Sequence, residues 1–273
     1  MMAKVSKVLT IAGSDSGGGA GIQADLKTFQ ELGVYGMSVI TAVTAQNTLG
    51  VQGVLALPVD IIIQQIDSIG TDLEPQGLKT GMLFSKEIIE AVACQITKYG
   101  WPNLVVDPVM IAKGGTALLR EDAVEAMRKV LIPLAEVVTP NILEAEVLAG
   151  FGIETLEDRK EAAKQIYKLG AKHVLVKGGH GKESEEAIDI LYDGKIFTKF
   201  TATRILTKDT HGTGCTFAAA IASELAKGST MQNAIQTAKS FIQSAIAYPL
   251  GLGHGHGPTN HWAYNRMNER TKV

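Results

Sequence analysis

Apolar residues occur along the chain in two patterns that alternate from one end to the other. In the first pattern they are nearly continuous, as over residues 8–12 and 104–106, which is typical of strands buried on both faces of a sheet. In the second they recur at helical spacing, as at Ile22, Leu26 and Phe29, which predicts a helix that buries one face. The alternation predicts an α/β fold with a mostly parallel sheet covered by helices.

Both patterns together give a series of elements. We predict strands over residues 8–12, 35–45, 51–57, 77–83, 104–106, 136–141, 173–179, 187–192, 195–203 and 205–208. We predict helices over residues 22–32, 60–69, 86–99, 121–130, 156–169, 216–227 and 231–247, and one more that begins near residue 144. Asp193 and Gly194 join two of the strands into a short β hairpin. No linker, repeat or low-complexity segment interrupts the series, so we expect a single domain over residues 1–273.

Composition and charge limit what the chain can do. Hydrophobic residues make up 45% of the chain and charged residues 20%, as in globular proteins. A net charge of −2 gives no attraction to nucleic acid or to an anionic membrane. No apolar stretch approaches the length that spans a bilayer. We therefore expect a cytoplasmic protein without nucleic-acid or membrane partners.

The two cysteines, Cys94 and Cys215, are far apart in the sequence. They exclude a disulfide framework and a zinc cluster, and they suit a reducing compartment. Cys94 falls within the predicted helix 86–99, where we expect it to be a core residue. Cys215 lies in a segment that carries chemistry of its own.

That segment, residues 209–217, precedes a helix of small residues. The first N–H groups of a helix lack intrahelical partners and carry the positive end of the macrodipole. Gly212 and Gly214, on either side of Thr213, would let a phosphate approach these groups. Cys215 in the first turn should then have a pKa lowered toward the thiolate. The pattern predicts an anion site, although a glycine turn before a buried helix, with Cys215 as a small core residue, fits it equally.

A second glycine-rich loop, residues 13–21, follows the first predicted strand. Its glycines are not followed by the lysine of a P-loop. Gly19, Gly21 and Ala24 half fit the dinucleotide fingerprint, but no acidic residue lies between Glu31 and Asp60 to hold a ribose. We therefore exclude both nucleotide motifs for this loop.

Polar or glycine residues follow almost every predicted strand. Ligands of open parallel sheets bind beyond the carboxyl ends of the strands, so these residues should meet at one edge. They are Ser14-Asp15, Gln46-Asn47, Thr80-Gly81-Met82, Asp107-Pro108, Thr139-Pro140-Asn141, Lys177-Gly178-Gly179 and 209–217. Loops are polar in any protein, but together these strand ends predict a site for a nucleotide and a small molecule.

Phosphoryl transfer would give several of these residues a role. It needs carboxylates for a metal, cations for the phosphates and amides for the developing charge. Asp107 and Glu144 are candidate ligands of Mg²⁺, through water, and Lys177 could reach a phosphate. Gln46, both a donor and an acceptor, suits the edge of a nitrogen heterocycle. The plain alternatives are a helix N-terminal charge for Glu144 and a solvated lysine for Lys177.

Ordered blocks of sequence carry a family resemblance over nearly the whole chain. The blocks are residues 9–16, 18–28, 44–48, 79–83, 107–110, 139–144 and 210–216. In them the chain resembles the bacterial hydroxymethylpyrimidine/phosphomethylpyrimidine kinases of thiamine biosynthesis, within the ribokinase-like kinases. The resemblance implies a ribokinase-like α/β/α sandwich in three layers. It also implies an enzyme that uses ATP and Mg²⁺ to phosphorylate the hydroxymethyl group of an aminopyrimidine and then the resulting monophosphate.

The resemblance assigns roles to positions of this chain. Gln46 and Asp25 would hold the pyrimidine, surrounded by Ala20, Val43, Met82 and Val109. The anion hole would consist of Gly212, Thr213, Gly214 and Cys215, with Cys215 in the place of an aspartate base. Asp107 and Glu144 would serve Mg²⁺ together with Asn141, and the nucleotide would contact Lys177, Thr139 and Asn141. Gly17 stands where the pattern leads us to expect a serine.

Two alternative functions remain open at this point. Pyridoxal kinase, a close branch, differs only in the heterocycle. Its members carry a second cysteine where this chain has Ala112, so we expect the pyrimidine to be preferred. A non-catalytic sensor of the same fold would be expected to lack Asp107, Lys177 or the glycine segment. We also predict a homodimer.

The remaining histidines have less specific surroundings. His254, His256 and His261 lie near one another in a glycine-rich tail, where no cysteine or carboxylate completes a metal site. We therefore expect a loop that closes over the sheet edge. His211, beside the predicted anion site, should support its loop rather than act as a general base.

Overall fold

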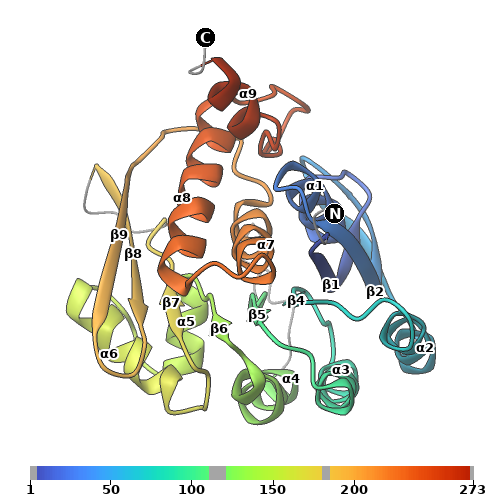
Figure 1. Ribbon diagram of the computed structural model, residues 1–273. Coiled ribbons are helices and arrows are strands. Elements are labelled where there is room, and N and C mark those ends of the chain that lie inside the picture. Colours follow the sequence, from blue (N-terminus) through green and yellow to red (C-terminus); the bar gives the residue numbers. More distant parts are fainter. Residues whose placement is uncertain (1–4, 111–120, 180–184, 271–273) are drawn as a thin grey trace.

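The structure is a computed structural model that describes residues 5–110, 121–179 and 185–270. Its described strands form a nine-stranded sheet in the order β3-β2-β1-β4-β5-β6-β7-β8-β9 (Figure 1). The parallel strands are β1 (Lys7–Asp15), β2 (Tyr35–Asn47), β4 (Gly77–Thr80), β5 (Leu104–Val106), β6 (Val137–Val138) and β7 (Val174–Val176). Three strands at the ends of the sheet pair in antiparallel fashion: β3 (Gly50–Ala56), β8 (Glu186–Tyr192) and β9 (Phe197–Thr203). The predicted mostly parallel sheet and its hairpin, β8–β9, are confirmed.

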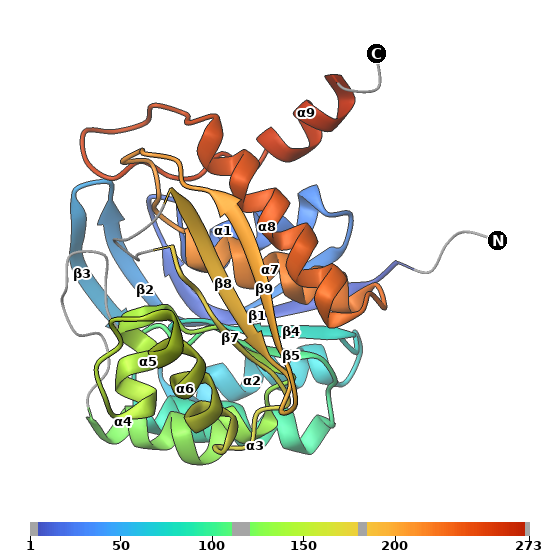
Figure 2. The same cartoon turned by 90° about the vertical axis from the view of Figure 1, so that its left-hand side faces the viewer.

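Helices cover both faces of the sheet, so the fold has three layers (Figure 2). One face carries α1 (Gly21–Glu31), α7 (Thr213–Ala226) and α8 (Met231–Ala247), and α9 (Ala263–Arg270) packs on α8. The other carries α2 (Val59–Gly70), α3 (Lys86–Tyr99), α4 (Glu121–Ala126), α5 (Ile142–Ala149) and α6 (Leu156–Tyr167). The ribokinase-like α/β/α sandwich expected from the resemblance is therefore present.

The central strands are apolar throughout because they bury residues on both faces. In β5, Leu104 and Val106 belong to the core under α2–α6, whereas Val105 belongs to the core under α1, α7 and α8. All three side chains are buried. A strand sandwiched between two helix layers has no solvent face, so its sequence shows no polar alternation.

The structure corrects the sequence prediction at several elements. Residues 205–208 form no strand, because the chain leaves the ladder after Thr203 and crosses back to α7 without pairing with a described strand, with Leu206 93% exposed. Helix α7 begins three residues earlier than predicted, at Thr213, and the predicted helix 121–130 turns into a π-helical segment at Met127. The sequence prediction missed α9. Cys94, expected in the core, is exposed, because α3 turns Val92 and Ala93 rather than Cys94 toward the sheet.

Among the helices of the described ranges, none combines the length and the apolar character needed to cross a membrane.

Candidate active site

The carboxyl ends of the central strands bring an acid, a lysine and the start of a helix together. Asp107 follows β5 and Lys177 follows β7. Asp107 is 3% exposed, and its Oδ1 lies 2.8 Å from Nζ of Lys177. A Cβ atom added at Gly214, in the first turn of α7, would lie 3.5 Å from Lys177 Nζ and 3.7 Å from Asp107 Oδ2. The start of α7 therefore faces this ion pair.

Glycine shapes the backbone at the start of α7. Gly212 precedes the helix with a φ of 83°, in the left-handed region that favours glycine. A Cβ atom at Gly212 would overlap the carbonyl oxygen of Gly19. No side chain of the described residues caps this helix, so the amides of Gly214 and Cys215 have no intrahelical partner. Such amides form a ready site for an anion.

Cys215 differs from the expectation in its protonation. Burial raises the pKa of its thiol to about 11, and the charges of Asp25 and Asp107 add to the rise. The charge of Lys79 and the amide of Gly21 act in the opposite direction without outweighing burial. The predicted lowering of the Cys215 pKa is therefore wrong. Removing a thiolate from water destabilises it more than the helix terminus and Lys79 stabilise it.

Asp107, Lys177 and Glu144 form one electrostatic cluster. Burial alone would lower the pKa of Lys177, but Asp107 and Glu144 outweigh it and raise the pKa. Burial raises the pKa of Glu144 to about 7, and the neighbouring Asp107 adds to the rise while Lys177 opposes it. Two carboxyl groups thus share one lysine, and a divalent cation would relieve their repulsion.

Asn141 and Glu144 also hold the start of α5. Oδ1 of Asn141 accepts a hydrogen bond from the Glu144 N–H at 3.0 Å, and Oε2 of Glu144 accepts one from the Asn141 N–H at 2.8 Å. This reciprocal pair is a capping box. The helix-terminal position that we considered for Glu144 is therefore present, whatever else the residue binds. Thr139 is fully buried, with Oγ1 3.5 Å from Asp107 Oδ1.

Asp25 is paired with a lysine that the sequence analysis did not single out. Lys79 on β4 is 0% exposed and lies 2.9 Å from Asp25 Oδ2, which also accepts a hydrogen bond from Thr10 at 2.6 Å. The other carboxylate oxygen, Oδ1, is buried without a partner among the described residues. A lysine must be paired to be buried, and Asp25 supplies that pairing here; the residues around Lys79 in the sequence give no signal of it.

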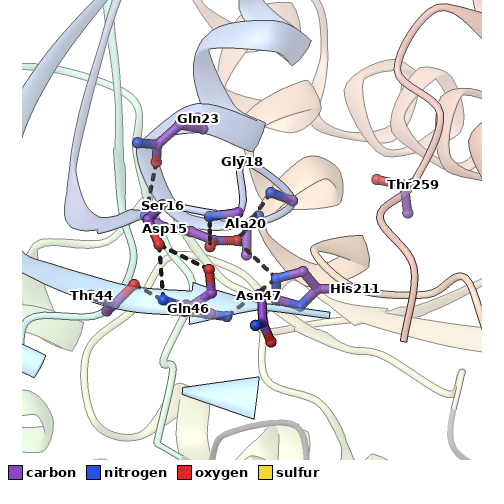
Figure 3. A network of polar contacts seen from close by, with 12 residues as sticks. Asp15, Ser16, Gly18, Ala20, Gln23, Thr44, Gln46, Asn47, His211 and Thr259 are labelled. Atoms are coloured by element: carbon purple, nitrogen blue, oxygen red, sulfur yellow. Dashed lines mark hydrogen bonds and ion pairs between the residues drawn. The ribbon is translucent and has the colours of Figure 1, made fainter. Parts of the chain in front are cut away.

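Asp15 organises the glycine-rich loop after β1 (Figure 3). Its carboxylate accepts hydrogen bonds from the amides of Gly17, Gly19 and Ala20, and it lies 2.8 Å from Nε2 of His211. Burial would raise the pKa of Asp15, but the hydrogen bonds from His211, Ala20 and Gly17 hold it below its usual value. These contacts join the loop to the start of α7 through His211, as expected of a residue that supports the loop.

Gln46, at the end of β2, lies beside this network (Figure 3). Its amide nitrogen is 3.3 Å from Nε2 of His211, and its amide oxygen is 3.1 Å from Oγ1 of Thr44. The Gln46 N–H donates to Ser16 Oγ and the Ser16 hydroxyl donates to the Gln46 carbonyl, both at 2.8 Å. The side chain is therefore held at the strand end where we expected a heterocycle to bind.

The apolar residues predicted around the heterocycle lie at the same strand ends. Ala20 precedes α1, and Val43 lies on β2 with 44% of its surface exposed. Met82 follows β4 and Val109 follows β5, and both are half-buried. Their contact with a ligand stays a prediction. Ala112 lies outside the described residues, as do Lys113, Gly114 and Gly115.

The tail separates the three histidines of the predicted loop. The His256 N–H donates to the carbonyl of Thr48 at 2.8 Å, next to the end of β2. His261 is instead buried under α7, with Nε2 3.0 Å from Thr216 Oγ1, and burial lowers its pKa to about 4. The backbone of Gly257 and Thr259 pairs with that of His211. The tail thus runs past the sheet edge, from Thr48 to the start of α7.

Comparison with known proteins agrees with this geometry. The family model for phosphomethylpyrimidine kinase matches residues 15–260. The chain is 55% identical to the hydroxymethylpyrimidine/phosphomethylpyrimidine kinase of Bacillus subtilis, with 98% of each chain covered. It is 53% identical to the thiamine biosynthesis bifunctional protein ThiED of Geobacter sulfurreducens, covering 93% of this chain and 52% of that protein.

Solved structures share the fold of this chain. The pyridoxal kinase from Staphylococcus aureus, in complex with AMP-PCP and pyridoxal, is 41% identical and superposes with a TM-score of 0.89. The superposition covers 97% of this chain and 96% of that one. Since the family model matches residues 15–260 and the Bacillus subtilis relative is 55% identical over 98% of each chain, the chain belongs to the phosphomethylpyrimidine kinase family.

Proposed function

We propose that this protein is an ATP-dependent hydroxymethylpyrimidine/phosphomethylpyrimidine kinase of thiamine biosynthesis. The observation that carries the proposal is the start of α7, whose first turn has no side-chain cap and lies beside the Asp107–Lys177 ion pair at Gly214. Amides, a cation and a carboxylate at one point are what transfer of a phosphoryl group requires. The relatives named for this activity match over nearly the whole chain.

Each group then has a defined task. The amides of Gly214 and Cys215 would stabilise charge on the transferred phosphoryl group, and Lys177 would neutralise and orient the phosphates. Cys215 would lie beside the attacking hydroxymethyl group, and Gln46 would bind the ring edge. Because phosphoryl transfer is mostly positioning and charge stabilisation, the backbone of α7 would contribute together with these side chains.

Mg²⁺ fits the acidic cluster. Burial is the main cause of the raised pKa of Glu144 and the charge of Asp107 adds to it; a divalent cation between the two carboxyl groups would offset both effects. Among the described residues no three His, Cys, Asp or Glu side chains come together as a metal site. The protein would therefore supply few of the ligands, and water and phosphate would supply the others, which is the usual arrangement for Mg²⁺. When bound, the metal would neutralise charge on the phosphates.

The test is turnover on the pyrimidine itself. The purified protein should release ADP from ATP and Mg²⁺ in the presence of the hydroxymethylpyrimidine, and mass spectrometry should find the monophosphate followed by the diphosphate. Lys177→Met, which keeps an unbranched side chain one atom shorter and removes its charge, should lose most of this turnover. ADP release no faster than without the pyrimidine would refute the proposal.

Pyridoxal is the second candidate substrate. The Staphylococcus aureus structure that superposes on this chain contains pyridoxal, so the scaffold can hold that ring. We infer that the pyrimidine is preferred here, because Ala112 has no thiol to react with an aldehyde. Measuring kcat/KM for both alcohols shows which substrate is preferred. Ala112→Cys should raise kcat/KM for pyridoxal.

We further propose that the protein acts as a homodimer in the cytoplasm. The β2–β3 end of the sheet supports the dimer, since four apolar residues of this edge are exposed: Leu49 (71%), Leu55 (68%), Val51 (42%) and Val54 (40%). Exposed apolar residues at a sheet edge can pair with a second copy of the chain. Light scattering should give twice the mass of the chain, and a monomer at micromolar concentration would contradict the proposal.

A further inference from the structure

The hydrogen bonds around Gln46 determine which way its amide points. Asp15 is 3% exposed, and its pKa is held below the usual value, so it is a carboxylate that can only accept. Nε2 of His211, 2.8 Å from Asp15 Oδ2, must therefore carry the hydrogen and donate it. Nε2 of Gln46 lies 3.3 Å from this same nitrogen. With the amide nitrogen on that side, two donors face each other.

The other end of the amide has the complementary conflict. Oγ1 of Thr44 lies 3.0 Å from the carbonyl oxygen of Ser14 and 3.1 Å from Oε1 of Gln46. The threonine hydroxyl has one hydrogen for two oxygens that can only accept. Exchanging the two amide atoms, which have nearly the same shape, removes the facing donors and gives every hydrogen an acceptor. The nitrogen then donates to Thr44 and Thr44 donates to Ser14, while the single Nε2–H of His211 is shared between Asp15, at 2.8 Å, and the Gln46 oxygen, at 3.3 Å.

We propose that Asp15 and His211 are positioning residues that fix the order of acceptor and donor on the Gln46 amide, and so make the site select an aminopyrimidine edge over a pyrimidinone edge. The inference rests on the proposed function, in which Gln46 binds the pyrimidine. An amino group beside a ring nitrogen offers a donor and an acceptor. A carbonyl beside a ring N–H offers the reverse order. An amide that cannot turn pairs with only one of them.

The contacts around His211 hold its imidazole ring in place. A Cβ atom at Gly19 would overlap the imidazole ring, so the ring packs directly on the loop backbone. The His211 N–H donates to the Gly257 carbonyl at 3.0 Å, and the His211 carbonyl accepts from the Thr259 N–H at 3.2 Å. The backbone of the α7 start is thus held without help from the imidazole. A change of this side chain can therefore be tested apart from the anion site.

The experiment compares two substrates that differ in one group. These are the 4-aminopyrimidine alcohol and its 4-oxo analogue, tested on the parent, His211→Phe and His211→Gln. Phenylalanine keeps a ring against Gly19 but donates no hydrogen bond, whereas the glutamine NH₂ can donate to both Asp15 and Gln46. Sites that read a hydrogen-bonding pattern reject the wrong one by about 10³-fold or more in kcat/KM. We expect such a preference in the parent and in His211→Gln.

In His211→Phe we expect the preference to fall at least about tenfold, through weaker use of the amino compound and better use of the oxo compound. Thr44→Val, which removes the other partner of the amide, should shift the preference in the same direction. A purely supporting role for His211 would lower kcat/KM for both substrates by the same factor. That result would overturn the inference, as would a parent that accepts both compounds equally.

Calorimetric binding of both pyrimidines separates this inference from the proposed function. If the parent binds the amino compound without phosphorylating it, the kinase proposal fails, while the ratio of the two affinities still decides the role of His211. If the amino compound does not bind at all, both proposals fall. The KM for ATP should stay within a few-fold of the parent in every variant, because the nucleotide is proposed to bind at Lys177, Thr139 and Asn141 and not at the amide of Gln46.

Discussion

Two glycines of the same loop should respond to alanine in opposite ways. Gly214 lies in the first turn of α7, where an added Cβ would be 3.5 Å or more from its nearest neighbours, an ordinary contact distance. Gly212 has a φ of 83°, and its added Cβ would overlap the carbonyl oxygen of Gly19. Alanine at 214 therefore fits the protein, whereas alanine at 212 does not.

The magnitudes follow from these positions. Alanine is better than glycine in a helix by about 0.5–1 kcal/mol, so Gly214→Ala should leave the free energy of unfolding equal or slightly higher. Its methyl group would point between Lys177 and Asp107, where the phosphoryl group is proposed to bind. A displacement of about 1 Å there lowers the rate by about 10²-fold. Gly212→Ala should cost about 1–2 kcal/mol from its backbone conformation alone, and more from the overlap.

Urea unfolding and steady-state kinetics on the two variants test both halves. We expect Gly214→Ala to be as stable as the parent with kcat lowered at least about 10²-fold, and Gly212→Ala to be clearly destabilised. Parent-like turnover in Gly214→Ala would show that no phosphate approaches this amide, and the anion site would then have to lie elsewhere. A loss of stability in Gly214→Ala would instead refute the packing on which the comparison depends.

Three further changes test other parts of the site. Gln46→Ala should raise the KM for the pyrimidine by an amount equivalent to about 1–3 kcal/mol for the unpaired ring edge, and an equal change in the KM for ATP would place Gln46 elsewhere. Cys215→Ala should lower kcat by about 10²–10⁴ if the thiol takes the proton, and turnover within a few-fold of the parent would leave it only a packing role. Burial lowers the pKa of His261 to about 4, so the stability gained from its neutral form is complete above about pH 6.5 and is lost as pH falls toward 4, by at most about 3 kcal/mol. Urea unfolding at both pH values should show a smaller loss in His261→Gln, and equal losses would contradict this account.

The sequence predicted the sheet and its helices because both leave local signals. Buried strands such as β5 are short apolar runs, and α3 and α8 were predicted to the residue. Helix α9 leaves no such signal, since its polar sequence is held by distant contacts: Asn265 bonds to Glu31, and Tyr264 packs on Phe241. The sequence also predicted which residues would gather at the site, because parallel topology alone places the carboxyl ends of the strands at one edge of the sheet.

The partners within the site were not predictable. Lys79 and Asp25 are 54 positions apart in the sequence, and nothing local in β4 says that its lysine is buried rather than solvated. Asp15 and His211 are separated by 196 positions, and only the folded chain shows that one holds the other. Pairings over such distances depend on the packing of whole layers, for which a single sequence gives residue types but no geometry.

Cys215 shows most clearly how the folded environment changes a local expectation. A thiol with a pKa near 11 is almost entirely protonated at pH 7, so a thiolate base would be scarce. Phosphoryl transfer tolerates this, because the attacking hydroxyl can keep its proton until the new bond has largely formed. If the thiolate nevertheless takes that proton, kcat/KM should rise about tenfold per pH unit from 7 to 9, as the thiolate fraction does. Cys215→Ala should lose the slope. A flat profile in the parent would mean that the thiol acts uncharged, and that the amides of α7 and Lys177 do the work assigned to a base.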